Sequence, residues 1–145
     1  MALKACGSAR GSQRISNDQL GERVETNDDW IRTRTGIRNR RIAGPGQTLS
    51  TLAADAAREA LTMAGWDADS VDLILLATST PDDLFGSAPR LQARLGATQA
   101  VAFDLTAACS GFLFALVTAS QYLRTGAMKR VLVVGADQLL SLIHI

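Results

Sequence analysis

Three short apolar runs alternate with helix-forming segments, and this alternation restricts the chain to the α/β class. The runs cover residues 73–77, 101–105 and 131–134 and are almost continuously apolar, which is typical of strands buried on both faces of a parallel sheet. Helical patterns separate them, so each connection is expected to be a right-handed crossover between parallel strands. We therefore expect a mostly parallel sheet with helices on both faces.

The segment 48–64 carries the clearest helical signal. Its leucines and alanines recur at spacings of three and four, and Gly65 follows as a stop. Further helices are predicted over 87–95 and from about 111 to 124. The last of these is apolar nearly all round, so it requires cover on every side and otherwise exposes an apolar patch.

The first forty residues give weaker signals. Residues 3–8 are predicted to form a short opening strand, and residues 17–24 a short helix capped by Asn17 or Asp18. A second helix is predicted to begin at the cap cluster of Asn27 and to end at Gly36.

The composition excludes several classes of protein. Of the 145 residues, 47% are hydrophobic and 20% charged, which is the range of a globular domain and not of a disordered chain. Fifteen basic and fourteen acidic residues leave a net charge of +1, so no global field favours nucleic acid or an anionic membrane. With no export signal or membrane-spanning run, we expect a cytoplasmic protein whose two cysteines are thiols.

Cys109 is the most informative residue. It follows the run 101–105 and a turn of small residues, and it stands at the start of the helix 111–124. Backbone N–H groups at a helix start favour a thiolate and a developing oxyanion, whereas a buried structural cysteine is the alternative. The position alone favours neither. Cys6 has no helix start beside it and is interpreted as structural.

Several separated motifs resemble β-ketoacyl-acyl carrier protein synthase III, of the thiolase superfamily. They are Ala107–Phe112 around the cysteine, Asp29–Arg38, the segment from Ala77 through Phe85, Gln92–Gly96, and Arg130–Asp137, all in the family's order. The resemblance covers roughly residues 1–139 and favours Cys109 as a nucleophile. It implies a thiolase-like fold, of which this chain is the N-terminal half: a five-layer αβαβα architecture with a mostly parallel core sheet.

The resemblance also implies a reaction. Family members start fatty-acid synthesis: the cysteine takes an acyl group from acyl-CoA, and the thioester is then joined to malonyl-acyl carrier protein with decarboxylation. Cys109 matches the catalytic nucleophile. Trp30 and Arg34, and more weakly Thr26, match positions that hold the CoA end, and Phe85 matches a residue lining the acyl pocket across a dimer interface. The partners are thus acyl-CoA, malonyl-acyl carrier protein and a second copy, with no permanently bound cofactor and no metal.

A cluster of arginines accompanies the Trp30 motif. Arg32, Arg34, Arg38, Arg40 and Arg41 place five guanidinium groups within ten residues, which suits the phosphates of CoA or an acidic carrier protein. We expect ligand binding for Arg34, and a structural or solvated role for Arg38, Arg40 and Arg41.

The resemblance places the decarboxylating histidine and asparagine in a second half of the family's chain. The lone histidine, His144, lies in the stretch 140–145, which we interpret as a non-native tail after a half-domain of residues 1–139. His144 is therefore given no role.

Other functions remain open from the sequence. A polyketide starter synthase or another acyltransferase would use the same cysteine. An inactive fragment or a non-catalytic binding module is a different class. A Rossmann-type module would need a glycine-rich turn after its first strand, and Gly7–Gly11 has the wrong spacing.

Overall fold

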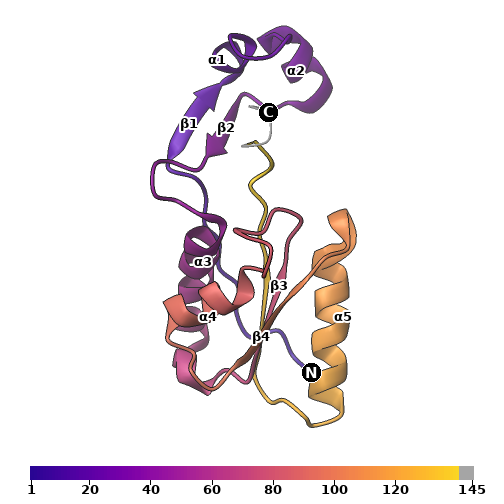
Figure 1. Ribbon diagram of the computed structural model, residues 1–145. Helices are drawn as coiled ribbons and strands as arrows, with labels where there is room; N and C mark the ends of the chain where they lie inside the picture. Colours follow the sequence, from indigo (N-terminus) through magenta and orange to yellow (C-terminus); the bar gives the residue numbers. More distant parts are fainter. Residues whose placement is uncertain (141–145) are drawn as a thin grey trace. The chain divides into compact units, whose positions relative to one another are not determined.

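The computed structural model describes residues 1–140 (Figure 1). Within them the chain forms two compact units. Met1–Ala9 and Thr48–Asp137 make up the first unit, and Arg10–Gln47 with the described residues after Asp137 make up the second. Of the predicted tail over 140–145, residues 141–145 lie outside the described residues.

The first unit is built on a three-stranded parallel sheet of order β4-β3-β5. Its strands are β3 (Leu73–Ala77), β4 (Val101–Leu105) and β5 (Val131–Gly135), in register so that Ala77 lies opposite both Leu105 and Gly135. All five β3 residues are buried, as their apolar run predicts. The predicted parallel sheet is confirmed.

Helices cover both faces of this sheet. Figure 1 shows α3 (Leu49–Ala64) and α4 (Ala88–Leu95) on one side and α5 (Gly111–Arg124) on the other. Because side chains alternate along a strand, Ile74 and Leu76 of β3 join the core beneath α3 and α4. Leu73 and Leu75 join the core beneath α5.

Two of the three strands are less buried than predicted. Val101 is 52% exposed and the rest of β4 is half-buried, and Val131, Leu132 and Val133 of β5 are half-buried too. Within residues 1–140, β4 and β5 each pair with β3 alone, so both lie at a sheet edge. The helix α5 turns its small residues Ala115 and Ala119 to the sheet, whereas Phe112, Leu113, Phe114 and Val117 are exposed. This is the predicted apolar patch.

Helix boundaries follow the predicted caps closely. Thr48 caps α3 with its side chain, and Gly65 and Gly96 end α3 and α4 with positive φ angles, which glycine adopts without steric cost. Two short 3₁₀ turns, η1 (Ala68–Ser70) and η2 (Ala108–Ser110), precede β3 and α5.

The second unit pairs β1 (Gln13–Ser16) with β2 (Asn39–Ile42) in an antiparallel ribbon, and the chain between these two strands forms two helices. The helix α1 (Asn17–Gly21) is capped by Ser16 and not by Asn17 or Asp18 as predicted, and it ends three residues before the predicted end at residue 24. The helix α2 (Asp28–Thr35) has Asn27 as its N-cap and Gly36 as its left-handed C-cap, as predicted.

The predicted strand over residues 3–8 is wrong. These residues have no regular structure. The Ser8 N–H donates to Glu59 Oε2 on α3 at 2.7 Å, and a Cβ on Gly7 would collide with the Ala56 carbonyl oxygen. This segment therefore runs against the backbone of α3 and does not add to a sheet.

Candidate active site

Cys109 lies in a tight turn between β4 and α5. Its thiol is free and exposed, so the alternative of a buried structural cysteine is wrong for this structure. The turn is unusual because Ala108 has a φ of 44°, in the left-handed region that a non-glycine residue rarely adopts. The Ser110 N–H donates to the Ala107 carbonyl at 3.0 Å and closes the turn.

The cysteine turn is located at the carboxyl end of the parallel sheet. In the register, β4 ends at Leu105 opposite Ala77 of β3, which in turn lies opposite Gly135 of β5. Loops that follow parallel strands at this edge are where α/β folds collect functional groups. Thr78, Thr106 and Asp137 come from these three strand ends, and of these Thr78 and Asp137 lie within motifs that carry the family resemblance.

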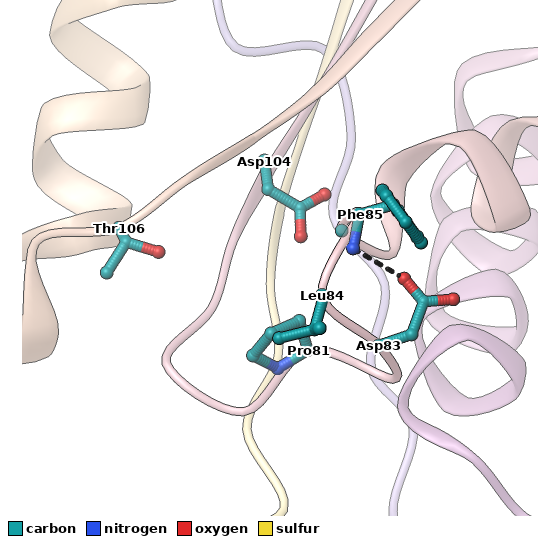
Figure 2. Close-up of a pocket in the computed structure, with 7 residues that line it drawn as sticks. Pro81, Asp83, Leu84, Phe85, Asp104 and Thr106 are labelled. Atoms are coloured by element: carbon teal, nitrogen blue, oxygen red, sulfur yellow. Dashed lines mark hydrogen bonds between the residues drawn. The ribbon is translucent and has the colours of Figure 1, made fainter.

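A second loop at the same edge carries Phe85. Figure 2 shows an open hollow lined by Pro81, Asp83, Leu84, Phe85, Gly86, Asp104 and Thr106. The Phe85 side chain is 93% exposed, although its backbone N–H donates to Asp83 Oδ1 at 2.8 Å. An ordered loop therefore presents an aromatic ring that nothing within the described chain covers.

Trp30 and Arg34 form one surface feature of the second unit. Both lie on α2, and the Arg34 guanidinium carbon is 4.6 Å from the centroid of the Trp30 ring, within cation–π range. The indole is 51% exposed. Thr26 is half-buried, just before the cap of α2. The structure thus brings Trp30 and Arg34 together, whereas Cys109 and Phe85 belong to the first unit.

The other arginines of this cluster have mostly local partners. Arg32 pairs with Asp28 at 3.6 Å, and Arg40 donates to Asn17 Oδ1 at 2.8 Å. The Arg41 guanidinium donates to the Ser12 carbonyl. For Arg40 and Arg41 this agrees with the expected structural role, because both side chains tie β2 to the residues beside it.

Within residues 1–140, no group of three or more histidine, cysteine or acidic side chains has the arrangement of a metal site. None of the helices described is long and apolar enough to cross a membrane. Cys6 is also exposed, in the segment that runs against α3, so its interpretation as a buried structural cysteine is wrong as well.

Known proteins resemble this chain both in sequence and in structure. Residues 103–145 match the model of the family 3-oxoacyl-[acyl-carrier-protein (ACP)] synthase III. A β-ketoacyl-[acyl-carrier-protein] synthase III from Prochlorococcus marinus (strain MIT 9313) is 74% identical over 139 residues, which are 96% of this chain and 41% of that relative. The chain thus spans less than half the length of the curated relatives it matches.

Solved structures agree with the sequence relatives. The 3-oxoacyl-[acyl-carrier-protein] synthase III from Aquifex aeolicus VF5 superposes with a TM-score of 0.90 at 42% identity, covering 95% of this chain and 45% of that one. The priming β-ketosynthase from the R1128 polyketide biosynthetic pathway gives a TM-score of 0.89 at 36% identity, covering 94% and 41%.

The strand order, the cysteine turn and these superpositions define a protein of the thiolase-like α/β class. The expected fold class is thereby confirmed. The chain is 74% identical over nearly its whole length to a β-ketoacyl-[acyl-carrier-protein] synthase III, and it corresponds to the N-terminal portion of such proteins.

Proposed function

We propose that this chain carries the acyl-accepting cysteine of a condensing enzyme that starts fatty-acid synthesis. The single observation that carries the proposal is the placement of Cys109: a free, exposed thiol directly before α5, in a chain 74% identical to a β-ketoacyl-[acyl-carrier-protein] synthase III. The function of the whole protein is part of the proposal, since the chain spans 41% of that relative.

In the first step, the Cys109 thiolate attacks the thioester carbonyl of acyl-CoA. The new C–S bond forms as the bond to the CoA sulfur breaks, and CoA leaves as its thiolate. The negative charge that develops on the carbonyl oxygen is stabilised by backbone N–H groups at the start of α5. Ala107, Ala108 and Gly111 are small, so they leave room beside the sulfur for the acyl group.

In the second step, malonyl-acyl carrier protein loses CO₂, and the resulting carbanion attacks the acyl-Cys109 thioester. The cysteine leaves as a thiolate and is ready for another acyl-CoA, while a 3-oxoacyl chain remains on the carrier protein. Splitting the reaction around a covalent intermediate replaces one difficult step by two easier ones. The resemblance assigns the decarboxylation to a histidine and an asparagine outside residues 1–139.

Trp30, Arg34 and Thr26 are proposed to hold the CoA end. An exposed indole offers a face for a purine to stack on, and the neighbouring guanidinium complements a phosphate. Phe85 is proposed to line the acyl pocket across a homodimer interface, which would cover the ring that is exposed in the single chain.

The proposal is tested by incubating the chain with acetyl-CoA and measuring its intact mass. An acetyl adduct located at Cys109 by peptide mapping is expected, and it should be absent from Cys109→Ala. The matched control is Cys6→Ala, which should be acylated like the unmodified chain. Acylation that persists in Cys109→Ala, or no acylation at all in a folded chain, would contradict the proposal and favour a binding module.

Priming of a polyketide pathway is the second candidate, favoured by the 36% identity to the R1128 priming β-ketosynthase. The two candidates share the acylation of Cys109 and differ in the carrier protein that takes the product. Comparing turnover on a fatty-acid carrier protein and on a polyketide carrier protein separates them.

A further inference from the structure

We infer that Thr106 and Asp137 are positioning residues that hold the Cys109 turn in its reactive geometry. The inference deepens the proposed function and rests on it, because it concerns how the nucleophile is oriented. Both act through hydrogen bonds that join the ends of the three strands.

Thr106 fastens β4 to β3 immediately before the turn. Its hydroxyl donates to the Thr78 carbonyl at 2.9 Å, and the Thr78 N–H donates to the Leu105 carbonyl at 3.2 Å. Thr106 lies three residues before Cys109. The last point at which the chain is bonded to the sheet before the cysteine is therefore the Thr106 hydroxyl.

Asp137 fixes the partner to which Thr106 is bonded. Its Oδ1 accepts the Ser79 N–H at 2.7 Å and lies 3.4 Å from the Thr78 hydroxyl. The Ala136 N–H donates to the Ala77 carbonyl at 3.0 Å, which extends the β3–β5 pairing to the residue before Asp137. Since Thr78 is only 4% exposed, its carbonyl is held at a defined position by β4 on one side and β5 on the other.

The turn around Cys109 requires these hydrogen bonds because its backbone is strained. Ala108 has a φ of 44°, and a non-glycine residue stays in that region only where the surrounding structure holds it. If the Thr106 bond is lost, Ala108 is free to relax toward negative φ. The sulfur of the next residue then moves relative to the N–H groups at the start of α5, which are proposed to stabilise the oxyanion of the acylation step.

The test compares three variants with a matched control in the full chain. Thr106→Val keeps the shape and loses the donor, Thr106→Ser keeps the donor, and Asp137→Asn keeps an acceptor without the charge. The control is Thr98→Val, whose hydroxyl donates to Asp69 at 2.9 Å near the opposite, amino end of β4.

Two rates are measured for each protein: acylation of Cys109 by acetyl-CoA, and alkylation by iodoacetamide. The exposed Cys6 of the same molecule is the internal reference for alkylation. Thermal unfolding is recorded in parallel. Thr106→Val is expected to lower both Cys109 rates about three- to tenfold, as displacement of a reacting group does. Asp137→Asn keeps an oxygen for the Ser79 N–H and is expected to lower them by a smaller factor. Thr106→Ser should restore them, and Thr98→Val should leave them unchanged.

The inference is overturned if Thr106→Val lowers the unfolding temperature as Thr98→Val does but leaves the ratio of Cys109 to Cys6 alkylation unchanged. That result would show that Thr106 has a structural role only. Failure of the proposed function is distinguishable from this. It would appear as a lack of acylation in every variant, while the alkylation ratio still decides whether Thr106 positions the thiol.

Discussion

Replacing Asp104 by alanine is expected to destabilise the first unit strongly, because one carboxylate serves two buried donors. Asp104 lies on β4, and its two oxygens accept the N–H groups of Ser87 at 2.8 Å and Ala88 at 2.6 Å. Both donor residues are 0% exposed. The start of α4 and the loop that carries Phe85 are therefore tied to the sheet by this side chain.

The magnitude follows from the two lost partners. A buried donor left without an acceptor costs about 1–3 kcal/mol, so Asp104→Ala is expected to lower the free energy of unfolding by about 2–5 kcal/mol. Asp104→Asn keeps one oxygen and turns an NH₂ group toward the other donor, for an expected loss of about 1–3 kcal/mol. Domains are typically stable by about 5–15 kcal/mol, so either loss is a large share.

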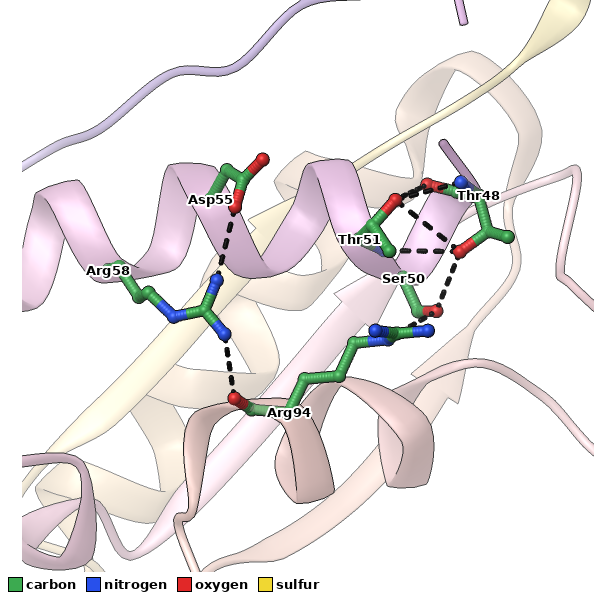
Figure 3. Close-up of polar contacts among 6 residues, drawn as sticks. All are labelled: Thr48, Ser50, Thr51, Asp55, Arg58 and Arg94. Carbon is green, nitrogen blue, oxygen red and sulfur yellow. Dashed lines mark hydrogen bonds and ion pairs between the residues drawn. The ribbon is translucent and has the colours of Figure 1, made fainter. Parts of the chain in front are cut away.

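Urea unfolding followed by circular dichroism measures the effect. With a slope of about 2 kcal/mol per molar urea, the Asp104→Ala midpoint should fall by about 1–2.5 M. The control is Asp55→Asn. Asp55 forms an exposed ion pair with Arg58 at 3.1 Å (Figure 3), and its loss is expected to cost less than about 0.5 kcal/mol. A midpoint for Asp104→Ala no lower than that of Asp55→Asn would refute the reasoning.

Three further outcomes are expected. Backbone N–H groups of Arg130 and, next, Lys129 hold the pKa of Asp72 below its ordinary value of 3.8. A carboxyl whose pKa is lowered by folding stabilises the folded state above its ordinary pKa and loses this effect as the pH falls through the lowered pKa. In urea unfolding, the greater stability of the unmodified chain over Asp72→Asn should therefore be full at pH 7 and disappear at acidic pH. Leu113 is 63% exposed on α5, so Leu113→Gln should reduce self-association in sedimentation and leave the unfolding midpoint nearly unchanged; an unchanged sedimentation profile would contradict this. Trp30→Ala should weaken CoA binding about tenfold in calorimetry, since stacking on an aromatic ring contributes about 1–3 kcal/mol per base, and equal affinity would exclude the indole from the binding site.

Elements whose signal is local could be predicted from the sequence. The strand Leu73–Ala77 and the helix α3 follow from apolar runs, spacing and caps, which depend only on neighbouring residues. The ribbon of β1 and β2 was missed because Asn-Arg-Arg-Ile has no apolar alternation. Its pairing comes from contact with a segment more than twenty residues away.

At the cysteine site, too, only the features with a local signal could be predicted from the sequence. Cys109 stands out because of the strand, the small residues and the helix around it, but its interpretation as a nucleophile depends on several separated motifs that resemble one family. The exposure of β4 depends on which strands pair with it, and a strand's own residues do not encode that. The left-handed Ala108 also had no sequence signal, because alanine gives no sign of a positive φ.

The loops around the site are held by aspartates that bind backbone far away in the sequence, so their conformation could not be predicted from local patterns. Asp82 accepts the N–H groups of Leu49 and Ser50 at the start of α3, Asp104 those at the start of α4, and Asp137 that of Ser79. Each carboxylate binds backbone 16 to 58 positions away, so no motif within one segment reveals it. A search for catalytic acids would single out these same residues at the carboxyl end of the sheet. Their oxygens already accept backbone N–H groups, so these side chains stabilise the loops that present Cys109 and Phe85, and the chemistry in the described residues rests on the thiol.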